Sequence, residues 1–331
     1  MTAPLNRKKF IKYSILTGLG LYLKPLTAWG NFLDGKKIGI IGLDTSHSLA
    51  FTKLLFEDTR NEFEGYKVVA AYPFGSKDLA LSIERIPIQT EEIKKYNVQI
   101  VDSIAELLKK VDVVLLETND GRLHLKQALE IIKAKKPFFI DKPMAASLAD
   151  AKAIFKAAAK HKVPVFSSSS LRFMTMVTDV KSGKYGEVLG AETYSPATIE
   201  KTHPDLFWYG IHGVETLFAV MGPNCQSVTR FFNEGAEVVV GTWDKNRIGT
   251  FRGLRSGKTD FGGTAYCQNE IVKLGPYLGY KPLLKEIIQF FKTGVSPVNQ
   301  NETLAILAFM EAAQESKENG GKTTYLHFIK E

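Results

Sequence analysis

The chain has 331 residues, of which 44% are hydrophobic and 24% charged, and its formal net charge is +8. These values are typical of a globular protein of about two domains and exclude a disordered, collagen-like or polytopic membrane chain. Two cysteines, Cys225 and Cys267, are too few for a fold held together by disulfide bonds. The basic excess raises the question of nucleic-acid binding, which depends on where that charge lies.

Residues 1–28 have the layout of an export signal. A basic segment, Asn6 to Lys12, precedes an apolar stretch of 11 residues, Tyr13 to Leu23, and a small-residue cleavage site. The apolar stretch is shorter than the roughly 20 residues of a spanning helix, so we expect no stable membrane anchor. The basic segment resembles a twin-arginine (Tat) signal, with Lys8 in place of the second arginine. We predict a periplasmic or exported protein; the alternative is a basic amphipathic N-terminal helix.

The export segment also explains most of the basic charge. It contains five basic and no acidic residues, so the net charge falls from +8 to +3 when it is removed. Later Lys and Arg residues are not interleaved with aromatic residues as they are in nucleic-acid-binding proteins. The sequence therefore predicts no nucleic-acid partner.

Residues 35–165 alternate short apolar runs with amphipathic segments of about ten residues. The expected buried strands are residues 36–43, 67–72, 98–101, 111–117, 137–141 and 164–169. The expected helices are residues 47–57, 123–134 and 147–161, with a short helix opened by Ser103. Ser103 with Glu106, and Ser147 with Asp150, mark helix N-termini. This alternation predicts an α/β fold, a Rossmann-like, doubly wound parallel sheet.

Residues 166–331 follow a different pattern. Strand candidates come in near succession at residues 188–194, 227–232, 237–242, 248–252, 264–268 and 270–274. The expected helices are residues 209–221, 281–292 and 302–317. The pattern predicts a C-terminal α+β domain with a largely antiparallel open sheet.

Polar segments follow three of the expected parallel strands. They are Gly39 to His47, Thr118 to His124 and Ile140 to Pro143. Ligands of open parallel sheets bind beyond the carboxyl ends of the strands, so these segments are candidates for a site. A later helix adds Tyr209 to Glu215.

This combination resembles the glucose–fructose oxidoreductase/inositol dehydrogenase (Gfo/Idh/MocA) family. Asp141-Lys142-Pro143 is similar to the family's Glu-Lys-Pro signature, and Gly210-Ile211-His212 to the segment with its catalytic histidine. Further similar features are Thr118 with His124, Arg172-Phe173, Tyr185-Gly186 and the helix from Ala305 to Ser316. The resemblance covers almost all of the chain after residue 35.

The resemblance implies an NAD(P)-dependent oxidoreductase that acts on the CH–OH groups of a sugar, sugar derivative or cyclitol by hydride transfer. It implies NAD or NADP as the cofactor and a carbohydrate as the substrate. It also implies that residues 166–331 bind the substrate and form a homo-oligomer, a dimer or tetramer, through the C-terminal sheet.

The dinucleotide-binding loop departs from the family pattern. The fingerprint G-x-G-x-x-G needs its later glycines for close approach of the pyrophosphate and for helix packing, but Asp44 and His47 follow Gly42 here. We expect Asp44 to cap the helix, while Thr45 and Ser46 hold a phosphate at the helix N-terminus. Alternatively, the loop is three residues shorter than usual and His47 matches a helix histidine of the family. A capped turn that binds no dinucleotide is the remaining interpretation.

The second strand lacks the acidic residue that usually binds the ribose hydroxyls. It is followed by Pro73 to Lys77, without a carboxylate before Asp78. Ser76 and Lys77 would then face the 2′-phosphate of NADP, or else are solvated loop residues. NAD is slightly preferred.

The predicted proton-transfer groups are Lys142 and His212. Four residues before His212, where the family carries an aspartate, stands Trp208. We therefore place Lys142 first, because a strand-end lysine near a cationic nicotinamide would have a lowered pKa. The alternatives are a surface ion pair for Lys142 and a hydrogen-bonded helix histidine without catalytic role for His212.

The remaining site predictions follow from the same segments. The predicted cofactor-binding residues are Gly42, Asp44, Thr45, Ser46, His47, Ser76, Thr118, Asn119, His124, Asp141 and Lys142. The predicted substrate-binding residues are Arg172, His203, Asp205, Trp208, Tyr209 and Glu215. His212 and Glu215 share one helix face and offer metal-ligand atoms, but no other spacing supports a metal, so none is predicted.

Two other functions stay open beside the exported oxidoreductase. One is a redox-neutral glycoside hydrolase or lyase that uses tightly bound NAD. The other is a non-catalytic sugar-binding protein that has lost the cofactor, as Asp44 and Trp208 would allow.

Overall fold

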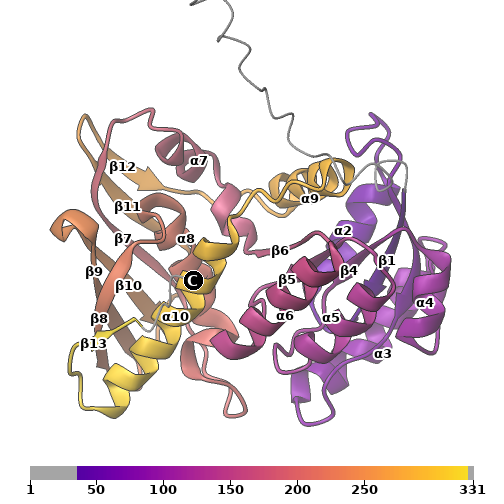
Figure 1. The fold of residues 1–331 in the computed structure, drawn as a ribbon, viewed down its shortest axis with the longest axis horizontal. Coiled ribbons are helices and arrows are strands. Elements are labelled where there is room, and N and C mark those ends of the chain that lie inside the picture. Colours follow the sequence, from indigo (N-terminus) through magenta and orange to yellow (C-terminus); the bar gives the residue numbers. More distant parts are fainter. Residues whose placement is uncertain (1–35, 327–331) are drawn as a thin grey trace, which may run out of the picture. The chain divides into compact units, whose positions relative to one another are not determined.

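The computed structural model describes residues 36–326, which fall within one compact unit and form two β-sheets (Figure 1). The predicted export signal, residues 1–28, lies outside the described residues. Within residues 36–326, no helix is long and apolar enough to cross a membrane.

The first sheet is parallel and has six strands in the order β3-β2-β1-β4-β5-β6. The strands are β1 (Lys37–Ile41), β2 (Lys67–Tyr72), β3 (Gln99–Ile100), β4 (Val113–Leu116), β5 (Phe138–Asp141) and β6 (Val165–Ser168). The strand order reverses between β1 and β4, so the carboxyl ends of these two strands border the switch point where ligands bind. The predicted Rossmann-like sheet is confirmed.

Helices cover both faces of this sheet. They are α2 (Ser46–Phe56), α3 (Ala80–Lys94), α4 (Ile104–Lys110), α5 (His124–Lys133) and α6 (Leu148–His161). Apolar side chains of α4, α5 and α6 pack with one face of the strands, and those of α2 and α3 with the other. Alternate strand residues serve the two faces, as Ile40 and Ile41 of β1 do.

The predicted helix starts have the expected local chemistry. The Ser103 hydroxyl accepts a hydrogen bond from the backbone N–H of Glu106, and the Ser147 hydroxyl from that of Asp150. Helix α3 was not predicted, because Pro87 lies inside it and a proline usually ends or kinks a helix.

The second sheet has seven strands in the order β12-β11-β7-β10-β9-β8-β13. They are β7 (Val188–Pro196), β8 (Cys225–Phe232), β9 (Ala236–Trp243), β10 (Ile248–Leu254), β11 (Gly262–Cys267), β12 (Ile271–Leu274) and β13 (Thr324–Tyr325). Strands β7 and β10 pair in parallel, and the other pairs are antiparallel. The predicted, largely antiparallel sheet is confirmed.

The later helices connect the two sheets. They are α7 (Thr175–Lys181), α8 (Ile211–Met221), α9 (Lys281–Thr293) and α10 (Gln300–Glu318). Helix α8 follows a π-helical turn, Leu206–Gly210, and is buried along its whole length against the second sheet. Helix α9 returns to the first sheet, where its apolar residues join the cluster of α2 (Figure 1). The loop before α9 thereby reaches the carboxyl ends of the parallel strands.

Candidate active site

A cavity of about 190 Å³ lies at the carboxyl ends of β1, β4 and β5. Its floor is formed by strand-end residues of the first sheet, among them His47, Asp141 and Lys142. Its opposite wall comes from the segment 208–212, from Phe261 and from the loop before α9. The switch point of the parallel sheet therefore faces residues of the second half of the chain, as predicted for a substrate site.

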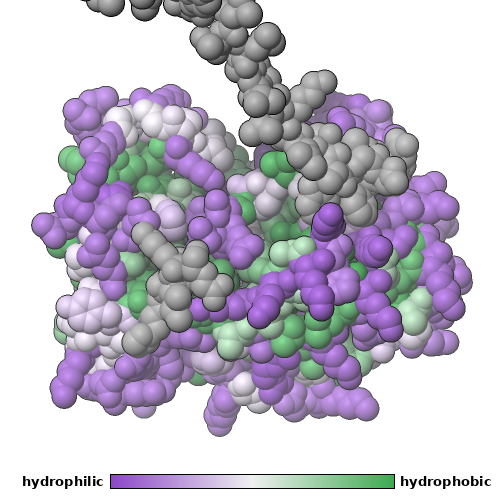
Figure 2. Space-filling view, in the orientation of Figure 1, coloured by the Kyte–Doolittle hydropathy of each residue, from purple (hydrophilic) through white to green (hydrophobic). Residues whose placement is uncertain are grey.

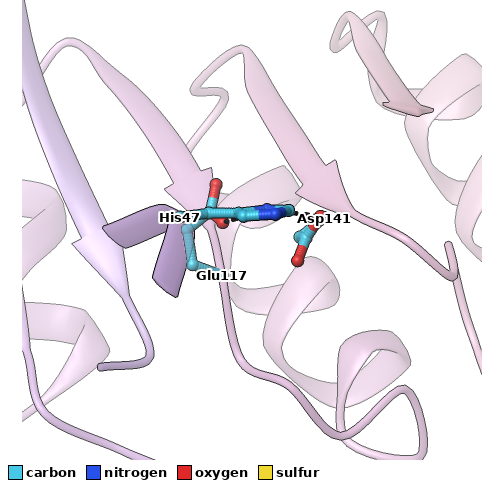
Figure 3. A group of neighbouring side chains, drawn as sticks. All are labelled: His47, Glu117 and Asp141. Carbon is cyan, nitrogen blue, oxygen red and sulfur yellow. Dashed lines mark ion pairs between the residues drawn. The ribbon is translucent and has the colours of Figure 1, made fainter. Parts of the chain in front are cut away.

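Three buried side chains meet at the floor of the cavity (Figure 3). His47 comes from the first turn of α2, Glu117 directly follows β4, and Asp141 ends β5. His47 Nδ1 lies 3.0 Å from an oxygen of Asp141 and 3.8 Å from an oxygen of Glu117. Nδ1 is close to both carboxylates but forms no hydrogen bond with either of them. We call these three residues the His47 cluster.

The two carboxyl groups of the His47 cluster differ in their pKa. Burial and the nearby Asp141 raise the pKa of Glu117 well above its ordinary value. Burial also acts on Asp141, but the charges of His47 and Lys142 outweigh it and lower the pKa of Asp141. Lys142 Nζ lies 3.6 Å from Asp141, on the side of that carboxylate away from His47. No lysine of residues 36–326 forms an ion pair with Glu117.

Lys142 and His212 both line the cavity. Lys142 follows β5, and its backbone N–H donates to the Asp141 carboxylate. His212 Nδ1 lies 2.8 Å from the Ser169 hydroxyl, which leaves Nε2 for the cavity. Burial and the neighbouring cation Lys142 lower the pKa of His212 well below its ordinary value, so its imidazole is neutral at pH 7. The two predicted proton-transfer groups therefore line the same cavity.

Aromatic rings form the upper wall of the cavity. Trp208 and Tyr209, both predicted for substrate binding, line it beside Phe261. Tyr277 and Tyr280, from the loop before α9, line it as well, and the Tyr280 ring lies 4.5 Å from the ring of His47. Flat apolar faces with polar edges suit the ring of a sugar or cyclitol.

Thr45, Ser46 and Arg85 form a site that fits a phosphate group at one end of the cavity. Helix α2 begins at Thr45 without any side-chain cap, so its first backbone N–H groups are free to bind an anion. The Thr45 hydroxyl is buried without a hydrogen-bond partner among the described residues. The guanidinium of Arg85 supplies positive charge. These groups match the pyrophosphate of a dinucleotide.

Asp44 does not cap α2, contrary to our expectation. Its carboxylate is turned away and accepts hydrogen bonds from the backbone N–H of Asn119 at 3.0 Å and from the Ser82 hydroxyl at 2.7 Å. Burial raises the pKa of Asp44 to about 6. Because the carboxylate is held inside the loop, it does not face the phosphate end of the cavity. Asn119 itself lines the cavity.

The segment after β2, where the adenosine ribose usually binds in Rossmann-like folds, is joined to the loop after β4 by side-chain contacts. The Ser76 hydroxyl donates to Asp120, and Arg122 bridges Asp120 to Asp78. Hydrogen bonds from His203, Arg122 and Ser76 overcome the effect of burial and hold the pKa of Asp120 well below its ordinary value. The cavity is smaller than the roughly 300–1,000 Å³ of most ligand sites. Binding of a whole dinucleotide would therefore require the contacts of Ser76 and Arg122 with Asp120 to separate.

These contacts correct two of the predicted roles. Ser76 is buried against Asp120, so it is not free to face a 2′-phosphate, whereas Lys77 is exposed. His203 was predicted to bind substrate, but its Nε2 lies 3.0 Å from Asp120 and it does not line the cavity.

Gly42, Thr118 and His124 shape the site from below. Gly42 has a φ of 95°, and a Cβ atom there would overlap the backbone of Thr118. The imidazole of His124 is fully buried and bridges the carbonyl oxygens of Thr118 and Pro143. Gly42 and His124 therefore hold the loops after β4 and β5 in place through Thr118 and Pro143. Neither Gly42 nor His124 lines the cavity.

Three further predicted substrate-binding residues lie outside the cavity. Arg172 is buried between Glu215 and Glu302, with its Nε 3.0 Å from Glu215. Asp205 pairs with Arg230 at 2.8 Å and with Lys317. Since their charges are paired in the interior, these residues stabilise the second domain and are not available to a substrate. Glu215 is likewise not free to join His212 in a metal site.

Sequence reasoning missed Arg85, Glu117, Tyr277 and Tyr280. Arg85 lies on the unpredicted helix α3, and the two tyrosines come from a loop far along the chain. Glu117 carried a signal that went unused: it is an acidic residue at the end of a strand that is buried throughout.

The comparisons with known proteins agree with this geometry. Residues 36–169 match the GFO_IDH_MocA family, described as an oxidoreductase family with an NAD-binding Rossmann fold. The prediction of an NAD-dependent oxidoreductase is thereby confirmed at the level of the family. A search of curated proteins gave no match.

Solved structures share the fold over most of the chain. The scyllo-inositol dehydrogenase of Lactobacillus casei with NAD(H) and scyllo-inositol has a TM-score of 0.72 at 13% identity, covering 88% of this chain and 99% of that chain. The myo-inositol dehydrogenase of the same organism, in complex with NAD(H) and myo-inositol, has a TM-score of 0.70 at 15% identity, covering 89% and 98%. Residues 36–169 thus match the NAD-binding Rossmann domain of the GFO_IDH_MocA oxidoreductase family, and the fold of both sheets is similar to that of these solved dehydrogenases.

Proposed function

We propose that the chain is an exported oxidoreductase that oxidises a secondary hydroxyl of a sugar or cyclitol with a nicotinamide cofactor. The observation that carries this proposal is that Lys142 and His212 line the same cavity at the switch point of the sheet. The solved dehydrogenases of the same fold bind inositols with NAD(H), which supports a polyol as the substrate class.

Separate groups of the chain would bind the cofactor and transfer the proton. Thr45, Ser46, Arg85 and the N-terminus of α2 would hold the pyrophosphate. The cofactor would supply the acceptor for the hydride. Lys142 and His212 would orient the substrate hydroxyl and take its proton. General acid–base catalysis requires such groups to lie within hydrogen-bond distance of that proton, and both residues line the cavity.

Neutral His212 is suited to this role. Since its pKa is lowered, it keeps a free lone pair or a single N–H at neutral pH, and Ser169 fixes the ring. The aromatic wall of Trp208 and Tyr209 would hold the face of the substrate ring and exclude water.

The proposal includes a location and an assembly. The export signal in residues 1–28 supports a periplasmic protein, where a tightly held cofactor would be recycled in place. Exposed apolar side chains on strands β7, β8, β10 and β12 of the second sheet support a homo-oligomer formed through that sheet; they are Leu189, Phe231, Ile248 and Ile271. Figure 2, in the orientation of Figure 1, shows hydrophilic side chains interspersed with hydrophobic patches on this face of the molecule.

A sugar-binding protein without cofactor is the second candidate. The small cavity and the contact of Ser76 with Asp120, at the place where the adenosine ribose would bind, favour it. A redox-neutral hydrolase or lyase remains a third function of the same site.

One experiment separates the three functions. The purified full chain is denatured and any released dinucleotide is identified; the folded protein is then supplied with NAD+ or NADP+ and a panel of cyclitols, aldoses and glycosides. We expect a bound or binding dinucleotide and reduction of the nicotinamide by a polyol. Cleavage of a glycoside without net reduction would indicate the redox-neutral function. Binding of a sugar without any dinucleotide would contradict the oxidoreductase.

Two variants connect the result to the site. Lys142→Ala should lower turnover by about 10²–10⁴-fold, which is typical for loss of a general acid or base. Lys53→Ala, on the exposed surface of α2, is the matched control and should leave turnover unchanged. Full activity of the Lys142 variant would remove Lys142 from the mechanism.

A further inference from the structure

The His47 cluster contains polar atoms that no described residue satisfies. Both carboxylate oxygens of Glu117 are fully buried and accept no hydrogen bond from residues 36–326. One oxygen of Asp141 and the Nδ1 atom of His47 also lack a hydrogen-bond partner within the described chain. Burial of a carboxylate without partners is costly, and natural proteins resolve such sites by pairing the charge or by binding a metal.

We propose that His47, Glu117 and Asp141 bind a divalent transition-metal ion, Zn²⁺ or Mn²⁺, at the floor of the cavity. One donor atom from each residue lies within 4.8 Å of the donor atoms of the other two. Figure 3 shows the imidazole ring directed to Asp141 with Glu117 beside it, each from a different element.

The distances suit a single ion. Zinc lies about 2.0–2.2 Å from nitrogen and oxygen ligands, so two donors on one ion are about 3.0–4.3 Å apart. His47 Nδ1 lies 3.0 Å from Asp141 and 3.8 Å from Glu117, within this range.

The charges favour a dication. Lys142 lies 3.6 Å from Asp141, whereas no lysine or arginine of residues 36–326 forms an ion pair with Glu117. A divalent ion would pair both carboxylates and use the imidazole lone pair. One nitrogen and two carboxylate ligands are suited to Zn²⁺ or Mn²⁺, whereas Mg²⁺ and Ca²⁺ prefer oxygen ligands throughout.

The position of the cluster gives the ion access to ligands. His47 and Asp141 line the cavity, so the coordination positions that the protein leaves open face it. A water molecule or an oxygen atom of a bound polyol would fill them. This inference does not rest on the proposed redox function, because it is argued only from the distances and the unpaired atoms of His47, Glu117 and Asp141.

The test uses the full chain without any dinucleotide. The metal content of the purified protein is measured by mass spectrometry, and chelator-treated protein is titrated with ZnCl₂ and MnCl₂ by calorimetry. We expect one ion per chain and a melting temperature that rises when the ion is returned. Glu117→Gln keeps the shape of the side chain and should weaken binding by at least ~100-fold, since even groups behind metal ligands change affinity by about 10–100-fold.

Asp120→Asn is the matched control. Asp120 is a buried carboxylate in the same loop, in contact with a histidine, but outside the His47 cluster. Its loss should leave the metal affinity within about twofold. Should Glu117→Gln fail to fold, crystals of the unchanged protein soaked in MnCl₂ give a second measurement, an anomalous difference peak between the three side chains.

The proposal is overturned if neither ion binds, if Glu117→Gln binds as tightly as the unchanged protein, or if the anomalous peak lies elsewhere. Dinucleotide binding is titrated separately with the chelator-treated protein. A metal without dinucleotide refutes the proposed function alone, and a dinucleotide without metal refutes this inference alone.

Discussion

Asp44 couples the stability of the N-terminal domain to pH. Its carboxyl group is fully buried, and burial raises its pKa from 3.8 to about 6. Between pH 4 and pH 6 the folded chain therefore keeps a proton that the unfolded chain has lost. The free energy of unfolding falls as the pH rises through this window and is constant, for this group, above it.

The size of the effect follows from the shift. One pKa unit corresponds to about 1.4 kcal/mol, so Asp44 lowers the free energy of unfolding by about 3 kcal/mol at pH 7 relative to pH 4. Asp44→Asn removes the titration and keeps both contacts. The amide oxygen accepts from the backbone of Asn119, and the amide N–H donates to the Ser82 hydroxyl. We expect the variant to be about 3 kcal/mol more stable at pH 7 and equal to the unchanged protein below pH 4.

Urea unfolding at pH 4, 5, 6 and 7, followed by circular dichroism, measures this difference directly. Other titrating groups cancel because both proteins carry them. A variant that is less stable at pH 7, or a difference that grows as the pH falls, would refute the reasoning.

The remaining predictions concern single contacts of the fold and the site. Gly42→Ala should cost more than ~3 kcal/mol of unfolding free energy, because its φ of 95° is strained for alanine and its Cβ meets the backbone of Thr118; Gly183→Ala, with a φ of 81° and open space, should cost only about 1 kcal/mol in the same urea titration. Arg172→Met should cost about 3–5 kcal/mol, because it leaves Glu215 and Glu302 buried without a cation, whereas Lys184→Met breaks an exposed pair worth at most about 1 kcal/mol; equal losses would contradict the account. Arg85→Ala should weaken dinucleotide binding by about 10–100-fold through loss of a charge-assisted hydrogen bond, while the exposed Arg60→Ala should not change it, as calorimetry would show.

Local sequence patterns were sufficient to predict most of the fold. Apolar runs such as residues 111–117 and the capping serines Ser103 and Ser147 depend on neighbours in the chain, and the structure has them where expected. Helix α3 was not predicted, because a proline such as Pro87 is unfavourable inside a helix. In the structure, packing of its buried residues against the first sheet stabilises it. The first-sheet side of the site was predictable for the same reason: strand ends of a parallel sheet converge.

The rest of the site depends on contacts between distant residues. The charge of Arg172 is taken up by Glu302, 130 residues away, and Tyr280 reaches His47 only because α9 returns to the first sheet. Neither pairing has a signature in the spacing of residues. Polar residue types alone therefore suggested substrate contacts for Arg172, Asp205 and Glu215, which the structure places in interior ion pairs.

Whether the cavity binds a nicotinamide dinucleotide is the central question, and calorimetric titration of the purified full chain with NADH and NADPH answers it most directly. The uncapped N-terminus of α2, the Thr45 hydroxyl and Arg85 predict saturable binding of one dinucleotide per chain, weakened by Arg85→Ala. Absence of any heat of binding with both dinucleotides, from protein shown to be free of bound nucleotide, would contradict the account.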